Sequence, residues 1–68
     1  MSNTPVKDKN YDLIAAVYNN AQGVAKLNQY IEDAQGEGDQ EAVEYFTTLR
    51  EQYHELGERG RRILKDRL

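Results

Sequence analysis

Apolar residues recur at helical intervals along two stretches of the chain. In the first stretch, gaps of three, four or seven residues separate Leu13, Val17, Val24, Leu27, Ile31 and Ala34. Such gaps place side chains on one face of an α-helix. They predict a helix over residues 10–35 with Asn10 as its N-terminal cap, and the poor helix formers around Gly23 allow a kink there.

The second stretch has a stricter repeat. Alternating gaps of four and three residues separate Ala42, Phe46, Leu49, Tyr53, Leu56, Gly60 and Ile63. A heptad repeat of this kind is typical of helices that pack side by side. It predicts a second helix over residues 40–66.

The segment "GEGD", residues 36–39, separates the two predicted helices. Gly36 suits the left-handed conformation that ends many helices, and Asp39 suits the cap of the next helix. Because so short a connection makes the helices antiparallel neighbours, the expected fold class is all-α, an antiparallel helical hairpin. Residues 1–9 are polar and are expected to form a flexible N-terminus, which leaves residues 10–68 as a single domain.

Two glycines, Gly57 and Gly60, interrupt the second apolar pattern. In a hairpin that folds back near residue 37, they lie opposite residues 15–18. The space that they leave is expected to let Tyr18 or Tyr11 pack between the helices. The alternative is a hinge, since helices bend at glycine.

The chain of 68 residues is short for a domain that folds alone. Chains of this size bury only about 60% of their unfolded surface, and many gain stability from disulfides, metals or partner subunits. The absence of cysteine excludes disulfides and thiolate metal sites. Because two helices leave part of each apolar face uncovered, we expect two hairpins to form a homodimeric four-helix bundle. Binding of a different protein through the same faces is the alternative.

The predicted interface consists of the larger residues of the two apolar faces. These are Val17, Val24, Leu27, Ile31, Phe46, Leu49, Tyr53, Leu56 and Ile63. Asn20 and Asn28 border these faces. They would fix the register if they formed hydrogen bonds across the interface, and would otherwise lie at its boundary with solvent.

Charge is distributed unevenly along the chain. Residues 1–58 carry four Lys/Arg against eleven Asp/Glu, net −7, whereas residues 59–68 carry five against one, net +4. The basic patch consists of Arg59, Arg61, Arg62 and Lys65. Cations at a helix C-terminus complement its dipole, and they can also bind a phosphate backbone. Nucleic acid is not the expected partner, because the acidic remainder repels it and no aromatic platform lies beside the patch.

The one histidine lies in the sequence "EQYH", where His54 follows Glu51 by three residues. Glu-x-x-His on a helix places two metal ligands one turn apart, as in di-iron four-helix bundles. The residues expected opposite, 22–24, include no acid. Both hypotheses therefore stand at this point: a metal site at Glu51 and His54, or a pair of surface residues.

Other chemistry is not indicated. Thr47 and Thr48 have no base beside them except the distant His54, and no glycine-rich phosphate loop is present. The chain is expected to be no enzyme and to need no cofactor. It also lacks an apolar run of about 20 residues and a signal-like segment, so a cytoplasmic protein without membrane contact is expected.

Residues 30–64 resemble the helical hairpin of the rubrerythrin branch of the ferritin-like proteins. The resemblance rests on the turn segment Ala34 to Gly38, then on Ala42 and Phe46, and finally on Glu51 and His54. The family's first helix carries a ligand glutamate about fourteen residues before the turn alanine, where this chain has Asn19, Asn20 and Gln22. The resemblance thus implies a half-length relative that kept the bundle and lost the complete iron site.

The chain is also similar to short, uncharacterised bacterial helical-hairpin proteins that share "YDLI", "QG", "YIEDA" and "GDQE". That similarity implies no activity. The leading functional prediction is a small non-enzymatic protein-interaction or regulatory homodimer. The alternatives are a degenerate ferritin-like metal-binding protein that uses Glu51 and His54, and weak nucleic-acid binding through the basic patch.

Overall fold

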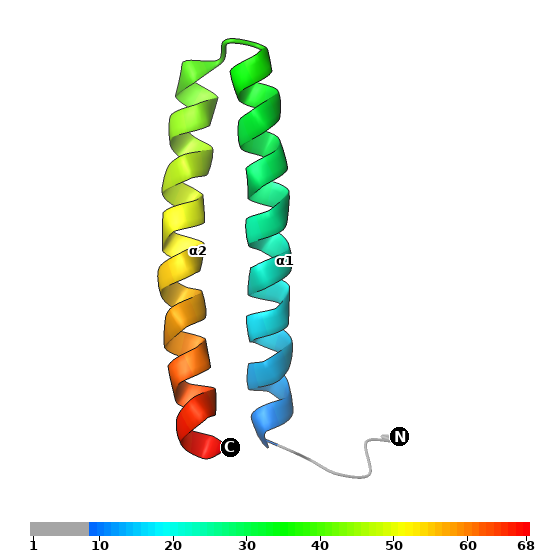
Figure 1. Cartoon of the computed structure of the whole chain (residues 1–68), viewed down its shortest axis with the longest axis vertical. Coiled ribbons are helices and arrows are strands. Elements are labelled where there is room, and N and C mark those ends of the chain that lie inside the picture. Colours follow the sequence, from blue (N-terminus) through cyan, green and yellow to red (C-terminus); the bar gives the residue numbers. More distant parts are fainter. Residues whose placement is uncertain (1–8) are drawn as a thin grey trace.

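The computed structural model describes residues 9–68, which form two long antiparallel helices joined by a short turn (Figure 1). Helix α1 spans Lys9–Gly36 and helix α2 spans Gln40–Arg67. The predicted all-α helical hairpin is confirmed, and each helix end lies within one residue of its prediction. The prediction of a flexible N-terminus falls outside the described residues, except for Lys9, which begins α1.

Helix α1 is continuous through Gly23, so the chain has no kink at that residue (Figure 1). Asn10 lies inside the first turn of α1 and is not its cap. Each helix has 28 residues and is therefore about 42 Å long. The two helices lie side by side over this whole length, which places the turn at one end of the rod and the helix termini at the other (Figure 1).

The turn ends α1 and begins α2 within three residues. The backbone N–H of Asp39 donates to the carbonyl of Ala34 over 2.9 Å, and the N–H of Gly38 donates to the carbonyl of Gln35 over 3.1 Å. This pair of bonds is a Schellman motif. Its left-handed residue is Gly38, with φ 69°, whereas the sequence had indicated Gly36. That prediction was wrong because Gly36 is still part of α1 and the chain reverses at Gly38.

Asp39 caps α2, as predicted. Its side-chain Oδ1 accepts a hydrogen bond from the backbone N–H of Ala42 over 3.2 Å. This bond satisfies one of the free donors of the first helical turn. A single residue therefore closes the Schellman motif of α1 and caps α2.

The core lies in the part of the hairpin nearest the turn. Its buried apolar side chains are Leu27, Ile31 and Ala34, all from α1. From α2, Phe46 packs against Tyr30, with ring centroids 5.5 Å apart and the planes tilted by 51°. Tilted aromatic pairs of this kind add stability beyond the area that they bury.

Toward the termini, the helices approach each other across glycines. A Cβ atom placed on Gly60 would lie 2.8 Å from Val17 Cγ2, and one placed on Gly57 would lie 2.6 Å from the side-chain oxygen of Asn20. In the middle of the hairpin, the ring of Tyr53 lies directly against Gly23. The prediction that Tyr18 or Tyr11 fills the space at Gly57 and Gly60 was wrong.

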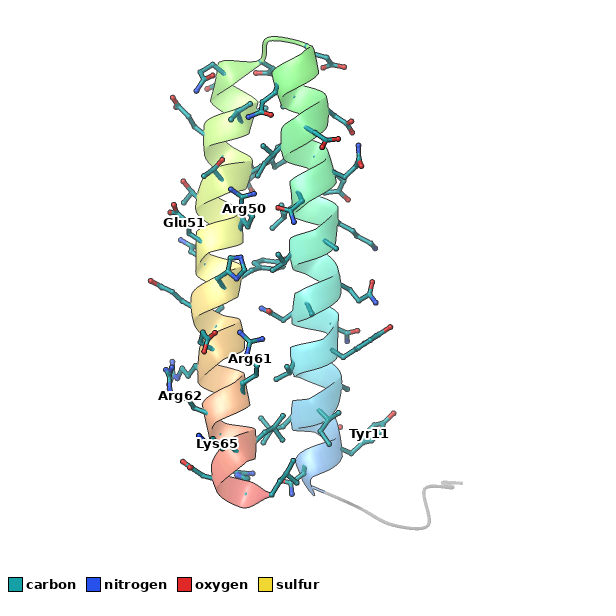
Figure 2. The ribbon with its side chains drawn as sticks, viewed as in Figure 1. Tyr11, Arg50, Glu51, Arg61, Arg62 and Lys65 are labelled. Atoms are coloured by element: carbon teal, nitrogen blue, oxygen red, sulfur yellow. The ribbon has the colours of Figure 1, made fainter. Side chains whose placement is uncertain are left out.

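Both tyrosines are exposed because neither lies on the face of α1 that meets the glycines. Gly60 lies opposite Val17, within the expected residues 15–18, whereas Gly57 lies opposite Asn20, two residues beyond that range. Tyr11 and Tyr18 lie on the side of α1 that faces away from α2, and both are more than three-fifths exposed. In Figure 2, Tyr11 points outward from the hairpin.

Two asparagines of α1 form hydrogen bonds to α2. Asn20 Nδ2 donates to the backbone carbonyl of Tyr53 over 2.8 Å, and Arg50 Nη1 donates to Asn28 Oδ1 over 2.7 Å. These bonds bridge the helices at two levels and so hold their relative register. Within the described residues, neither helix is both long and apolar enough to span a membrane.

Candidate functional site

One broad side of the hairpin exposes large apolar residues. On α2, gaps of four, seven and seven residues place Tyr45, Leu49, Leu56 and Ile63 along one line. Tyr30 of α1 lies on the same side, because Tyr30 and Tyr45 both pack against the ring of Phe46. We call these five residues the apolar side. Tyr30, Tyr45 and Leu56 are 45%, 62% and 59% exposed, and Leu49 and Ile63 are half-buried.

The opposite broad side is polar. Asn28 lies two residues before Tyr30, hence about 200° around α1 from it, and is bonded to Arg50. His54 follows Arg50 by four residues and Arg61 follows His54 by seven, which places all three on the same side. Figure 2 looks onto this side, where the side chains of Arg50 and Arg61 extend from α2 toward α1. The two sides of one thin hairpin therefore differ sharply in character.

A second exposed apolar group lies on the outer edge of α1. Gaps of three and four residues align Tyr11, Ile14 and Tyr18, and all three are exposed. Gln22 Nε2 donates to the hydroxyl of Tyr18 over 2.8 Å. This outer edge faces away from α2 and is separate from the apolar side.

The structure divides the predicted interface residues into three classes of burial. Leu27 and Ile31 are buried, and Leu56 is exposed. The other six are half-buried: Val17, Val24, Phe46, Leu49, Tyr53 and Ile63. Leu56 does not lie in the seam between the helices, because the buried Gly57 occupies that position.

The list of predicted interface residues does not contain Tyr30 and Tyr45, although the sequence places all five tyrosines on or beside the apolar faces, as is typical of core and interface residues. Tyr30 and Tyr45 each lie one residue away from a member of the predicted apolar faces, next to Ile31 and Phe46 respectively. A residue at such a flanking position lies about 100° around the helix from its neighbour. The available signal was therefore the aromatic character of the two flanking residues.

The residues of the metal hypothesis, Glu51 and His54, are both exposed. The Glu51 side chain points away from α1 (Figure 2), so α1 offers it no further ligand. Within residues 9–68, no group of three or more His, Cys, Asp or Glu side chains is arranged to hold a metal ion. The pair thus provides two ligands from a single helix, and the metal site stays a prediction.

The basic patch does not form one flat surface. Arg59, Arg61, Arg62 and Lys65 are all exposed on the last turns of α2. Arg62 points away from α1, whereas Arg61 extends toward it (Figure 2) and pairs with Glu58 over 2.9 Å. Exposed ion pairs within one helix contribute little to stability. The four cations therefore spread around the end of α2 and charge the whole terminal end of the rod.

The turn end of the rod carries the opposite charge. Residues 29–47 contain six acids and no Lys or Arg: Glu32, Asp33, Glu37, Asp39, Glu41 and Glu44. All six are exposed. Residues 59–67 contain five Lys/Arg against one Asp, net +4. The hairpin is therefore negative at the turn and positive at the C-terminal end of α2.

Comparisons with protein families, with curated proteins and with solved structures find no family model, no curated protein and no solved structure that matches this chain. The resemblance to ferritin-like proteins stays a prediction.

Proposed function

We propose that this protein is a small protein-interaction module that works as a homodimer. In the dimer, the apolar sides of two hairpins pack face to face and complete a four-helix bundle. The observation that carries the proposal is the exposure of Tyr30, Tyr45 and Leu56 on one side of the hairpin. Contiguous exposed apolar groups of this kind are typical of interaction sites.

The energetics support a partner on this side. Among the described residues, the buried apolar side chains of the single hairpin are Leu27, Ile31 and Ala34. Full burial of a large apolar side chain contributes roughly 1.5–3 kcal/mol. Burial of two copies of Tyr30, Tyr45 and Leu56 would therefore add a stabilising term as large as the core of either hairpin.

A second copy is the partner that the shape fits best. A two-fold interface requires a surface that is complementary to itself, and a flat side with a central line of aliphatic and aromatic residues meets that requirement. Interfaces rich in Tyr also bury large areas at a low cost in side-chain entropy. A different protein that binds the same side is the alternative outcome of the test.

Two tyrosines provide a matched pair of variants. Tyr45 on the apolar side and Tyr18 on the outer edge are both 62% exposed. We expect Tyr45→Gln to raise the dimer dissociation constant at least tenfold, because two tyrosines leave each interface, and Tyr18→Gln to leave it unchanged. Sedimentation equilibrium over a range of micromolar concentrations measures both constants, and circular dichroism verifies the helix content.

A wild-type mass of one chain over the whole concentration range would overturn the homodimer. Equal weakening by the two variants would show that the contact is not specific to the apolar side. Either result would mean that the apolar side is not a homodimer interface. A different protein would then be the expected partner of this side.

A further inference from the structure

Opposite charge at the two ends of the hairpin determines how two copies can stack. We infer that the hairpins pair antiparallel, so that the turn of each lies beside the C-terminal end of α2 in the other. This inference rests on the proposed homodimer and specifies its geometry. It also assigns the central contact to α2 of both copies.

A face-to-face dimer of hairpins has two symmetric arrangements. A two-fold axis along the rod places both turns at the same end, and an axis across the rod places them at opposite ends. Both arrangements cover the same apolar side. The choice between them therefore depends on charge and on which helix stacks on which.

Charge favours the arrangement with the turns at opposite ends. With the turns together, the six acids of residues 29–47 would lie beside the same six acids of the second copy. With the turns apart, they lie at the same end of the dimer as residues 59–67 of the second copy, which carry net +4. Exposed charges interact over about 8–10 Å at physiological salt, which is the interaxial distance of packed helices. Like charges across an interface suppress the wrong register, and opposite charges stabilise the right one.

The helix contacts favour the same arrangement. An axis across the rod stacks α2 on α2, so the line of Tyr45, Leu49, Leu56 and Ile63 meets its own copy. An axis along the rod would stack that line on α1. On this side α1 offers Tyr30, and seven-residue steps back from it lead only to Gly23 and Ala16.

The line on α2 is suited to antiparallel self-pairing. Its positions are Ala42, Tyr45, Leu49, Gln52, Leu56, Arg59 and Ile63, with gaps of three and four that alternate in either direction. With the axis near Gln52, Leu49 of each copy lies beside Leu56 of the other, and Tyr45 lies beside Arg59. The second contact places a guanidinium near an aromatic ring, which is an attractive arrangement.

Spin labels on single cysteines test the orientation, since the chain has no cysteine of its own. Gly36→Cys places a label at the turn, where a Cβ atom would have no neighbour within 4 Å. In the antiparallel dimer, two such labels are separated by about the length of a helix, roughly 40 Å. With the turns together, they would lie within about 20 Å, since packed helices are about 10 Å apart.

A label at His54→Cys distinguishes a dimer of the wrong orientation from the absence of a dimer. His54 lies on the polar side near the middle of α2, so it reports a dipolar signal in either dimer. A signal at this position together with a short distance at Gly36→Cys would overturn the antiparallel orientation and leave the homodimer intact. The absence of a dipolar signal from both labels would overturn the homodimer itself, and the orientation with it.

Salt dependence gives an independent readout of the same charges. In the antiparallel dimer, added salt screens attraction between the ends, so the dissociation constant is expected to rise several-fold between about 0.05 and 0.5 M NaCl. With the turns together, salt screens repulsion and the constant would fall. A constant that falls would therefore overturn the inference.

Discussion

The two halves of the hairpin hold the same pair of helices together in different ways. In the turn half, residues 24–52, side chains fill the seam: Leu27, Ile31 and Ala34 are buried, and Tyr30 packs on Phe46. In the open half, residues 9–23 and 53–68, the helices meet where side chains are missing. Glycine there accepts Tyr53, Asn20 and Val17 from the opposite helix.

This difference shows that two helices can pack either through large side chains between them or through glycines that let the helices approach closely. The turn half depends on large residues and is expected to be sensitive to truncation. The open half depends on close approach and is expected to be sensitive to enlargement. Both halves nevertheless expose large apolar residues, Tyr18 and Leu56 in the open half and Tyr30 and Tyr45 in the turn half.

Truncation in the turn half should have the largest effect. Leu27→Ala is expected to cost about 2–5 kcal/mol, because it leaves a cavity beside Ile31. A core of this size rarely supplies more than about 3–5 kcal/mol, so most of the helical signal should disappear. Urea unfolding followed by circular dichroism, at one protein concentration for all variants, measures the loss. Ile14→Ala, at the exposed outer edge, is the control, and an equal loss there would contradict the comparison.

Enlargement in the open half should come next. Gly60→Ala places a methyl group 2.8 Å from Val17 Cγ2, and the branched valine has one preferred rotamer in a helix. Overpacking costs about 1–3 kcal/mol, against a gain of at most about 1 kcal/mol in helix propensity. The free energy of unfolding should therefore fall. In a double-mutant cycle, Val17→Ala should relieve the clash, and strict additivity of the two changes would contradict it.

The two glycines of the turn differ in backbone conformation. Gly38 has a positive φ, so Gly38→Ala should destabilise the hairpin by roughly 1–2 kcal/mol. Gly36 is helical and a Cβ atom there has no neighbour within 4 Å. Gly36→Ala should therefore stabilise the hairpin by up to about 1 kcal/mol. Thermal unfolding of the two variants measures both signs, and the same sign for both would mean that the turn tolerates other conformations.

The smallest expected effect concerns the asparagine bonds. Asn20→Ala removes a half-buried hydrogen bond to the Tyr53 carbonyl and is expected to cost about 0.5–1.5 kcal/mol. Asn28→Ala removes the exposed bond from Arg50, which water replaces, so its cost should be smaller. The urea concentrations at the unfolding midpoints of the two variants show which substitution costs more stability. A larger loss for Asn28→Ala would place the register-holding contact in the turn half.

Periodicity predicted the two helices and their ends to within one residue. The cap at Asp39 was also correct, because a carboxylate three residues before a backbone donor is a local feature of the chain. The left-handed glycine was misplaced because Gly36 and Gly38 have the same chemistry. Only the point at which α1 stops distinguishes them, and that point depends on how the two helices meet.

The candidate site was predicted less well than the fold. The heptad pattern indicated an apolar arc on α2 but not which edge of the arc faces α1. Leu56 was therefore placed in the seam, although Gly57 lies there and Leu56 is exposed. The sequence predicted that Gly57 and Gly60 leave space between the helices, but the periodicity did not show that Asn20 and Val17 occupy it.

The sequence by itself determined two amphipathic helices, a short reversal and an uneven distribution of charge. These are local properties, fixed by residue spacing and by capping groups a few positions apart. Only the tertiary structure decided the register that pairs Gly60 with Val17 and turns Tyr45 and Leu56 outward. The physical reason is that register depends on the volume between two backbones, which is a property of residue pairs distant in sequence.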